Sequence, residues 1–287
     1  MASNVFTPQL RFRWLATLLL AILSLLPLVT ALRYGIEAAP DTPALNYTVA
    51  LLSSKETDPS TAHFARCGGV LVSARSVLTS ARCIQNETAQ TLSIRAGSRN
   101  RMVGGALVPV SQVTIHPEYN STTWDYDIAV LTLENDSAVH EGNATPARIG
   151  SYSSLFHDPR TTQGPDAGPV SGTAALYGWG LYNYSDAAFP ETLLTLPSAV
   201  FVRQDLCADI WHYIRNITAR MICDYPGNER ASWEGDRGGP LVDERSGEVL
   251  GLLSFSILET DLTQVVPEVS TSLEAVWGWV EGVVVWD

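Results

Sequence analysis

The chain has 287 residues, of which 46% are hydrophobic and 17% charged, a composition typical of a folded protein with a sizeable core and not of a disordered chain. Thirty acidic residues against 18 basic ones give a formal net charge of −12, which argues against nucleic acid as a partner. The four cysteines, an even number, suit two disulfide bonds formed in an oxidising compartment.

The N-terminus has the pattern of a targeting segment. Arg11 and Arg13 precede the apolar run Trp14–Val29, and small residues up to Ala31 suit signal peptidase. The alternative is a membrane anchor, but a span needs about 20 apolar residues and this run is shorter. We therefore predict a signal peptide over residues 1–31 and a secreted, extracellular protein with no membrane attachment after cleavage.

Glycosylation signals support the same compartment. Seven Asn-X-Ser/Thr sequons predict N-linked glycans on surface turns. The asparagines are Asn46, Asn86, Asn120, Asn135, Asn143, Asn183 and Asn216.

Beyond the targeting segment, short β-rich runs alternate with turn residues, a pattern typical of barrels or sandwiches. The predicted strands are Asn46–Ser53, Gly69–Val72, Ser76–Ser80, Gln112–Ile115, Ile128–Leu133, Thr173–Tyr177, Ser198–Val202, Leu250–Phe255 and Val265–Val269. Residues 151–172 are rich in Ser, Pro, Gly and Asp and predict a surface connection. The helical spacing of apolar residues over 272–286 predicts a closing helix.

Seven stretches, in order, resemble motifs of the trypsin/chymotrypsin family of serine proteases. They are Cys67–Leu71, Val77–Cys83, His116–Asn120, Asp125–Leu131, Tyr177–Gly180, Met221–Cys223 and Gly235–Val242. The resemblance implies an all-β fold of two six-stranded antiparallel barrels, a cleft between them and a C-terminal helix. It also implies the disulfides Cys67–Cys83 and Cys207–Cys223.

The expected organisation is one trypsin-like domain over residues 32–287. Its parts are an N-terminal barrel over about 32–150, a connection over about 151–172, a C-terminal barrel over about 173–271 and a helix over about 272–286.

The same resemblance places two arginines at catalytic positions. The family's base falls on Arg82, its carboxylate on Asp127 and its nucleophile on Arg237. A guanidinium stays protonated, so it neither accepts a proton from a nucleophile nor attacks a carbonyl. We therefore predict no functional catalytic residues. The five histidines have no nucleophile beside them in a motif and are interpreted as surface or structural: His63, His116, His140, His157 and His212.

The specificity pocket differs from the family pattern as well. Ala231 stands where a trypsin-like enzyme has an aspartate, and Glu268 replaces a glycine that keeps the pocket open. The substrate channel is expected at Ser254, Phe255 and Ser256. Trp233 replaces one cysteine of a pocket disulfide.

Other features of the nucleophile loop are retained. The backbone N–H groups of Gly235 and Arg237 offer an oxyanion-type nest. Asp236 is expected to pair with the amine of Leu32, the N-terminus left by the predicted signal cleavage. Two hypotheses concern the arginines: a structural ion pair between Asp127 and Arg82, or an anion site at Arg237 and the nest that takes a carboxylate or a sulfate.

The sequence thus predicts a secreted, non-catalytic serine protease homologue that acts by protein binding in an inhibitor-, decoy- or adhesion-like role. Its partner is expected to be an extracellular protein or a glycan-bearing one, with no cofactor and no metal. The alternatives are a serine-type endopeptidase with non-standard catalytic residues and a structural secreted glycoprotein.

Overall fold

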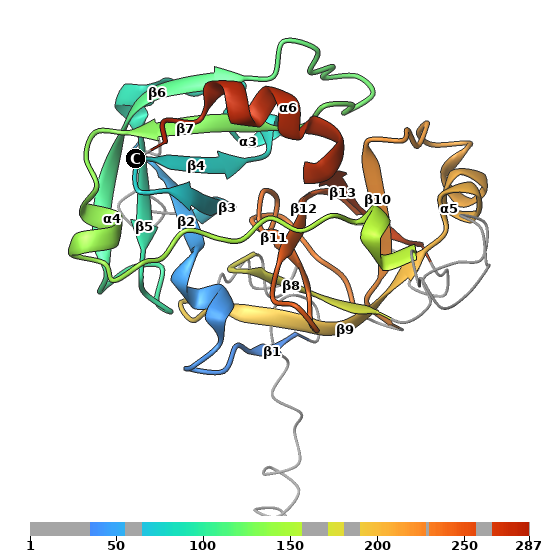
Figure 1. The fold of residues 1–287 in the computed structure, drawn as a ribbon, viewed down its shortest axis with the longest axis horizontal. Coiled ribbons are helices and arrows are strands. Elements are labelled where there is room, and N and C mark those ends of the chain that lie inside the picture. Colours follow the sequence, from blue (N-terminus) through green and yellow to red (C-terminus); the bar gives the residue numbers. More distant parts are fainter. Residues whose placement is uncertain are drawn as a thin grey trace, which may run out of the picture.

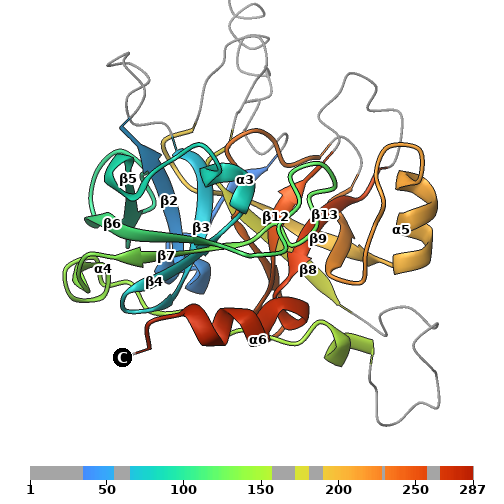
Figure 2. The ribbon, with the colours of Figure 1, turned by 90° about the horizontal axis from the view of Figure 1, so that it is seen from above.

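The structure of the protein is a computed structural model that describes residues 35–54, 65–156, 172–180, 190–227, 230–256 and 266–286. Two β-barrels lie side by side, and the C-terminal helix α6 lies against one side of them (Figures 1 and 2). The predicted signal peptide, residues 1–31, lies outside the described residues. No helix within the described ranges is long and apolar enough to cross a membrane.

Six antiparallel strands close the first barrel in the order β2-β3-β4-β7-β6-β5. They are β2 (Thr48–Ser53), β3 (Ala65–Ser73), β4 (Ser76–Thr79), β5 (Leu92–Ala96), β6 (Ala106–Ile115) and β7 (Ala129–Leu133). β5 shows the reason for closure most clearly, because its buried and half-buried residues alternate and so direct one face into the barrel.

The second barrel is closed by one long strand, Leu194–Val202, which forms hydrogen-bonded pairs with several other strands. Its strands are β8 (Thr173–Gly178), β9 (Leu194–Val202), β10 (Met221–Tyr225), β11 (Pro240–Asp243), β12 (Val249–Phe255) and β13 (Glu268–Ser272). They follow the order β9-β10-β13-β12-β11-β8, and pairing between β8 and β9 completes the ring. The short strand β1 (Ile36–Glu37) adds to β9, so this N-terminal segment joins the second barrel and not the first, where we expected it.

The helices are short except at the C-terminus. They are α3 (Ala81–Ile84), α4 (Ser137–His140), α5 (Gln204–Trp211), α6 (Leu273–Val283) and the 3-10 turns η1 (Pro43–Asn46), η2 (Ala89–Thr91) and η3 (Ser153–Phe156). Although α6 follows the second barrel, it buries Leu273, Val276 and Val280 in the same cluster as the core of the first. The helix thereby ties the two barrels together.

The sequence located most strands but not all their ends. The last strand was predicted over Val265–Val269, whereas β13 runs from Glu268 to Ser272. Val265, where the predicted strand begins, lies outside the described residues, and the segment that pairs with β10 and β12 begins at Glu268. The predicted strand ranges do not include β1, β5, β10 or β11, and α5 was not predicted either. β5 is only five residues long, although its apolar and polar residues alternate. The predicted connection over residues 151–172 lies largely outside the described residues.

Candidate functional site

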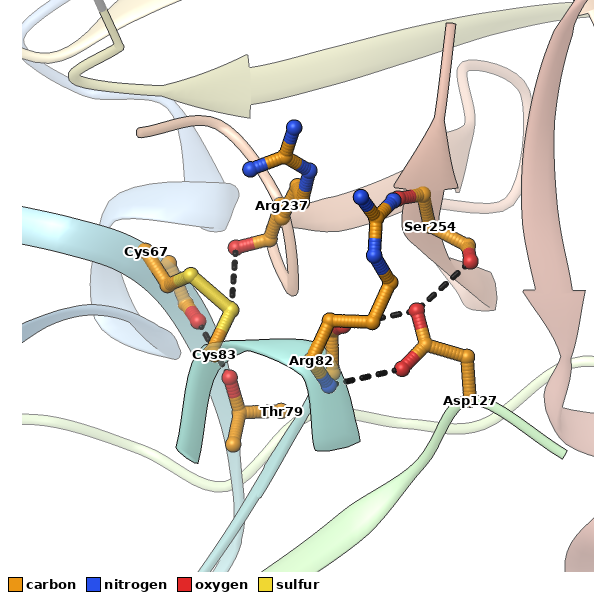
Figure 3. The surroundings of a disulfide bond; sticks show 9 residues. Cys67, Thr79, Arg82, Cys83, Asp127, Arg237 and Ser254 are labelled. Atoms are coloured by element: carbon orange, nitrogen blue, oxygen red, sulfur yellow. Dashed lines mark hydrogen bonds between the residues drawn. A yellow bond between two sulfur atoms is a disulfide. The ribbon is translucent and has the colours of Figure 1, made fainter. Parts of the chain in front are cut away.

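The three residues that the sequence motifs predict at the catalytic positions of the trypsin/chymotrypsin family come from separate elements and meet between the barrels (Figure 3). Arg82 lies in α3, Asp127 lies just before β7, and Arg237 lies in the loop before β11. The Arg237 carbonyl accepts the Gly68 N–H at 2.7 Å. This bond holds the loop of the second barrel against β3 of the first.

Asp127 is fully buried, and both of its carboxylate oxygens accept hydrogen bonds. Oδ2 accepts the hydroxyls of Ser80 at 2.7 Å and Ser254 at 2.6 Å. Oδ1 accepts the backbone N–H of Arg82 at 2.9 Å, one of the first-turn amides that a helix leaves without an internal acceptor. Burial raises the pKa of Asp127 despite these bonds.

The Arg82 side chain turns away from this carboxylate. Its Nη1 donates to the Ser254 carbonyl at 3.0 Å, and its guanidinium carbon lies 3.4 Å from the ring centre of Trp124. The hypothesis of a guanidinium–carboxylate ion pair between Arg82 and Asp127 is therefore wrong: the backbone amide makes the contact. Burial, followed by the charge of Arg237, lowers the pKa of Arg82 to about 10.

Arg237 is half-buried, and in Figure 3 its side chain extends away from Asp127, as does that of Arg82. Within the described ranges its guanidinium has no hydrogen-bond or ion-pair partner. The same holds, over those ranges, for the backbone N–H groups of Gly235 and Arg237, and Gly235 adopts a φ of 99° that favours glycine. Donors for an anion are thus present at the predicted nest.

Asp236 is buried and accepts the N–H of Gly180 at 2.7 Å and that of Trp233 at 2.9 Å. A Cβ at Gly178 or Gly180 would collide with its carboxylate, which explains why glycines flank Trp179. Burial raises the pKa of Asp236 to about 7. The expected partner Leu32 lies outside the described residues, so that pairing stays a prediction.

The region predicted to form the specificity pocket contains two buried carboxylates. Glu268 accepts the Ser232 N–H and faces Asp224 across the β10–β13 ladder, where the two are register partners. Both Asp224 oxygens and Glu268 Oε2 lack a hydrogen-bond partner. Burial raises the pKa of Asp224 and raises that of Glu268 to about 7. The Glu268 side chain is 2% exposed, so it is folded inward.

The other residues predicted for the specificity pocket and substrate channel are Ser254, Phe255, Ser256 and Ala231. The Ser254 backbone and hydroxyl join Arg82 to Asp127, as described above, and Ser256 Oγ donates to the Ser232 carbonyl at 3.0 Å. Phe255 is buried against Trp211 and Trp124, with ring centres 5.1 and 5.2 Å apart. Ala231 is half-buried.

The framework outside the centre follows the sequence predictions. Disulfides join Cys67 to Cys83 and Cys207 to Cys223, which confirms both pairs. Six of the seven sequon asparagines are exposed, and Asn183 lies outside the described residues. Whether any of them carries a glycan stays a prediction.

Three of the histidines are described. His116 is buried and stacks on Tyr126 with ring centres 4.4 Å apart, a structural role, while His140 and His212 are exposed. His63 and His157 lie outside the described ranges. In the part of the chain that the structure describes, no three His, Cys, Asp or Glu side chains group as metal ligands do.

Sequence reasoning missed several residues of this centre. Trp124 and Arg215 form a stacked group with Arg82, and Asp224 faces Glu268. Arg215 is more than 90 positions from Trp124 in the chain. Only the tertiary fold brings them together, so no local pattern marks them.

Comparison with known proteins gives consistent matches. A family model described as Trypsin matches residues 35–280. Hypodermin-A of Hypoderma lineatum is 30% identical over 191 residues, which are 67% of this chain and 68% of hypodermin-A. Trypsin delta of Drosophila melanogaster is 30% identical over 66% of this chain and 68% of its own. A solved structure of neuropsin, a serine protease expressed in the limbic system of mouse brain, has the same fold, with a TM-score of 0.64 and 24% identity over 87% of this chain and 98% of that one.

Proposed function

The chain belongs to the trypsin family of serine proteases, and from that premise we propose that it is a secreted, non-catalytic member that acts by binding an extracellular partner. The observation that carries the proposal is the centre itself. Arg82 and Arg237 lie around the buried Asp127, and the sequence motifs predict that the two arginines occupy the base and nucleophile positions of the family.

The chemistry of the family requires a group that removes the nucleophile's proton and a nucleophile that attacks the carbonyl. Arg82 remains protonated near neutral pH even with its pKa lowered to about 10. Asp127 already accepts three hydrogen bonds and thereby positions the residues around it. At the predicted base position it meets an arginine and not the imidazole that the family's carboxylate orients. Glu268, folded inward, takes up room in the pocket that a substrate side chain needs.

A binding role requires a rigid framework and exposed loops, and it does not require catalytic residues. A double barrel held by two disulfides and by α6 is a rigid support for surface loops and for the cleft. The predicted signal peptide and the exposed sequons support secretion as a glycoprotein. An inhibitor, decoy or adhesion role would each fit this architecture.

The test is an activity measurement on purified, secreted protein. A panel of fluorogenic peptide substrates and a serine-reactive phosphonate probe are applied at matched concentration to this chain and to an active trypsin. We expect no hydrolysis and no labelling of this chain. Inhibitor-sensitive hydrolysis that copurifies with the wild type and is lost in the Arg237→Ala variant would overturn the proposal in favour of an endopeptidase with non-standard residues. Activity unchanged in that variant and removed by further purification indicates a contaminant.

The third possibility, a structural glycoprotein, is tested by affinity capture from extracellular fluid. A specific binder retains a defined partner that is released by excess untagged chain, whereas a purely structural glycoprotein retains none. Variants that neutralise Arg82 or Arg237 then show whether the partner binds at this centre.

A further inference from the structure

The centre contains a cation–aromatic stack that the family comparison does not explain. The guanidinium carbons of Arg82 and Arg215 lie 3.4 and 3.3 Å from the same Trp124 ring centre. Two guanidinium planes cannot share one face of an indole at that distance, so they lie on opposite faces and are separated by roughly 6.7 Å at most. Such a stack holds both charged groups in fixed positions.

Each guanidinium is also fixed by one backbone carbonyl. Arg82 donates to the Ser254 carbonyl at 3.0 Å, and Arg215 donates to the Thr122 carbonyl at 2.6 Å. A guanidinium carries five N–H donors, so each of the two keeps donors for another partner. Both side chains and the indole are partly exposed, and a ligand can reach them.

The nearby carboxylates do not form ion pairs with this group. Asp127 is buried and already accepts three hydrogen bonds. Asp125 is engaged by Arg220, whose Nε and Nη2 lie 2.9 and 2.5 Å from its two oxygens. Over the described ranges, no carboxylate forms an ion pair with Arg82, Arg215 or Arg237.

The positive charges therefore gather around one indole without an ion-pair partner among the described residues. Burial, then the charge of Arg237 and, to a smaller extent, that of Arg215 lower the pKa of Arg82, whereas the charge of Asp127 raises it. A cationic group of this kind in a chain of net charge −12 marks a local site and not a general surface property. An incoming anion would relieve the repulsion.

We propose that the group formed by Arg82, Trp124, Arg215 and Arg237 recognises an acidic, extended segment of a protein partner. Successive residues of a strand rise about 3.3 Å, so carboxylates two positions apart on one face lie about 6.6 Å from each other. That spacing lies just within the upper limit of roughly 6.7 Å on the separation of the two guanidinium carbons on either side of Trp124. Each carboxylate can take two parallel N–H···O bonds from one arginine.

Arg237 and the free N–H groups of the nest extend the same surface. They offer donors for a third acceptor, either a further acidic side chain or a backbone carbonyl of the bound segment. The inference rests on the proposed non-catalytic role, because a segment held in this way must remain intact.

Fluorescence anisotropy with labelled peptides tests the proposal. The probe is a ten-residue Ser/Gly peptide with two aspartates separated by one residue, and its partners have the aspartates adjacent, four positions apart, or replaced by asparagine. We expect the spaced dicarboxylate to bind most tightly and the asparagine peptide about tenfold more weakly or worse, since hydrogen bonds to charged groups are lost. Binding should weaken as salt is raised.

Variants of the full chain locate the site. Arg215→Gln should weaken the spaced peptide by about tenfold, and its partly exposed position favours normal folding, which circular dichroism checks. Arg148→Gln is the matched control, because Arg148 is an exposed arginine bound to the Ser246 carbonyl at a turn of the second barrel. It should bind as the wild type does.

Several results would overturn the inference. They are equal affinity for the aspartate and asparagine peptides, an unchanged affinity in Arg215→Gln, preference for the four-residue spacing, or binding of a sulfated glycan with none of the peptides. Mass spectrometry of the peptide after incubation separates the two proposals. Cleavage contradicts the non-catalytic role, whereas an intact but unbound peptide contradicts only the acidic-segment recognition.

Discussion

Replacing Glu268 with glutamine should make the protein less sensitive to rising pH. In the wild type, Glu268 and Asp224 are buried register partners with three oxygens that lack hydrogen-bond partners, and no cation compensates them among the described residues. The other titratable groups that face the pair are Asp236 and Tyr152. Glutamine keeps the shape and the acceptor for the Ser232 N–H, and its amide can donate to Asp224.

The sign of the change in stability with pH follows from the direction of the pKa change of Glu268. Burial raises the pKa of Glu268 from 4.5 to about 7, so the folded state holds the proton more tightly than the unfolded state does. This stabilisation is fully present below pH 4.5 and is lost as the pH rises through about 7. At 1.36 kcal/mol for each pKa unit, the free energy of unfolding falls by on the order of 3 kcal/mol over that range.

Thermal unfolding by circular dichroism between pH 5 and pH 8 measures the effect. The fall in melting temperature over this range should be about 6–12 °C smaller in Glu268→Gln than in the wild type. At pH 5, where Glu268 is protonated, the two should be similar. Glu281→Gln, which changes an exposed carboxylate on α6, is the control and should follow the wild type. Parallel pH profiles of Glu268→Gln and wild type would refute the reasoning.

Three further variants test the framework by urea denaturation. Asp127→Ala leaves three buried donors without an acceptor and should cost about 3 kcal/mol or more; a loss below 1 kcal/mol would contradict the hydrogen-bond assignment. Removing the disulfide by the double change Cys207→Ala and Cys223→Ala should cost about 3 kcal/mol, since the residues are 16 apart in sequence; unchanged stability would argue against that loop-closure effect. Gly180→Ala should cost about 1–3 kcal/mol through the clash with Asp236, and an unaffected variant would show that the carboxylate can move.

The sequence was sufficient for the fold and for the position of the centre because the family motifs are local. Cys67–Leu71 and Val77–Cys83 contain the residues that form β3, β4 and the first disulfide. The closing helix could be predicted because its apolar residues repeat at helical spacing, and α6 does bury them. Such features depend on neighbours in the chain.

Side-chain directions could not be predicted in the same way. The Asp127–Arg82 ion pair was expected because a buried charge is normally paired. Ser80 and Ser254 supply hydroxyls instead, and Ser254 lies 127 positions from Asp127. The aromatic face that attracts the Arg82 guanidinium likewise depends on the backbone at Trp124, which has a φ of 60°.

The carboxylates and the arginines of the centre differ in how many contacts they make within the described residues. Asp127 needs no catalytic reason to be present, because without it two buried hydroxyls and a helix amide would lack an acceptor. Asp236 similarly binds the backbone of two loops. Arg237 has no such partner among the described residues, so folding does not account for its guanidinium. A guanidinium without a partner among the described residues is available to a ligand, and the arginines of the cleft are therefore the residues at which partner binding should first be sought.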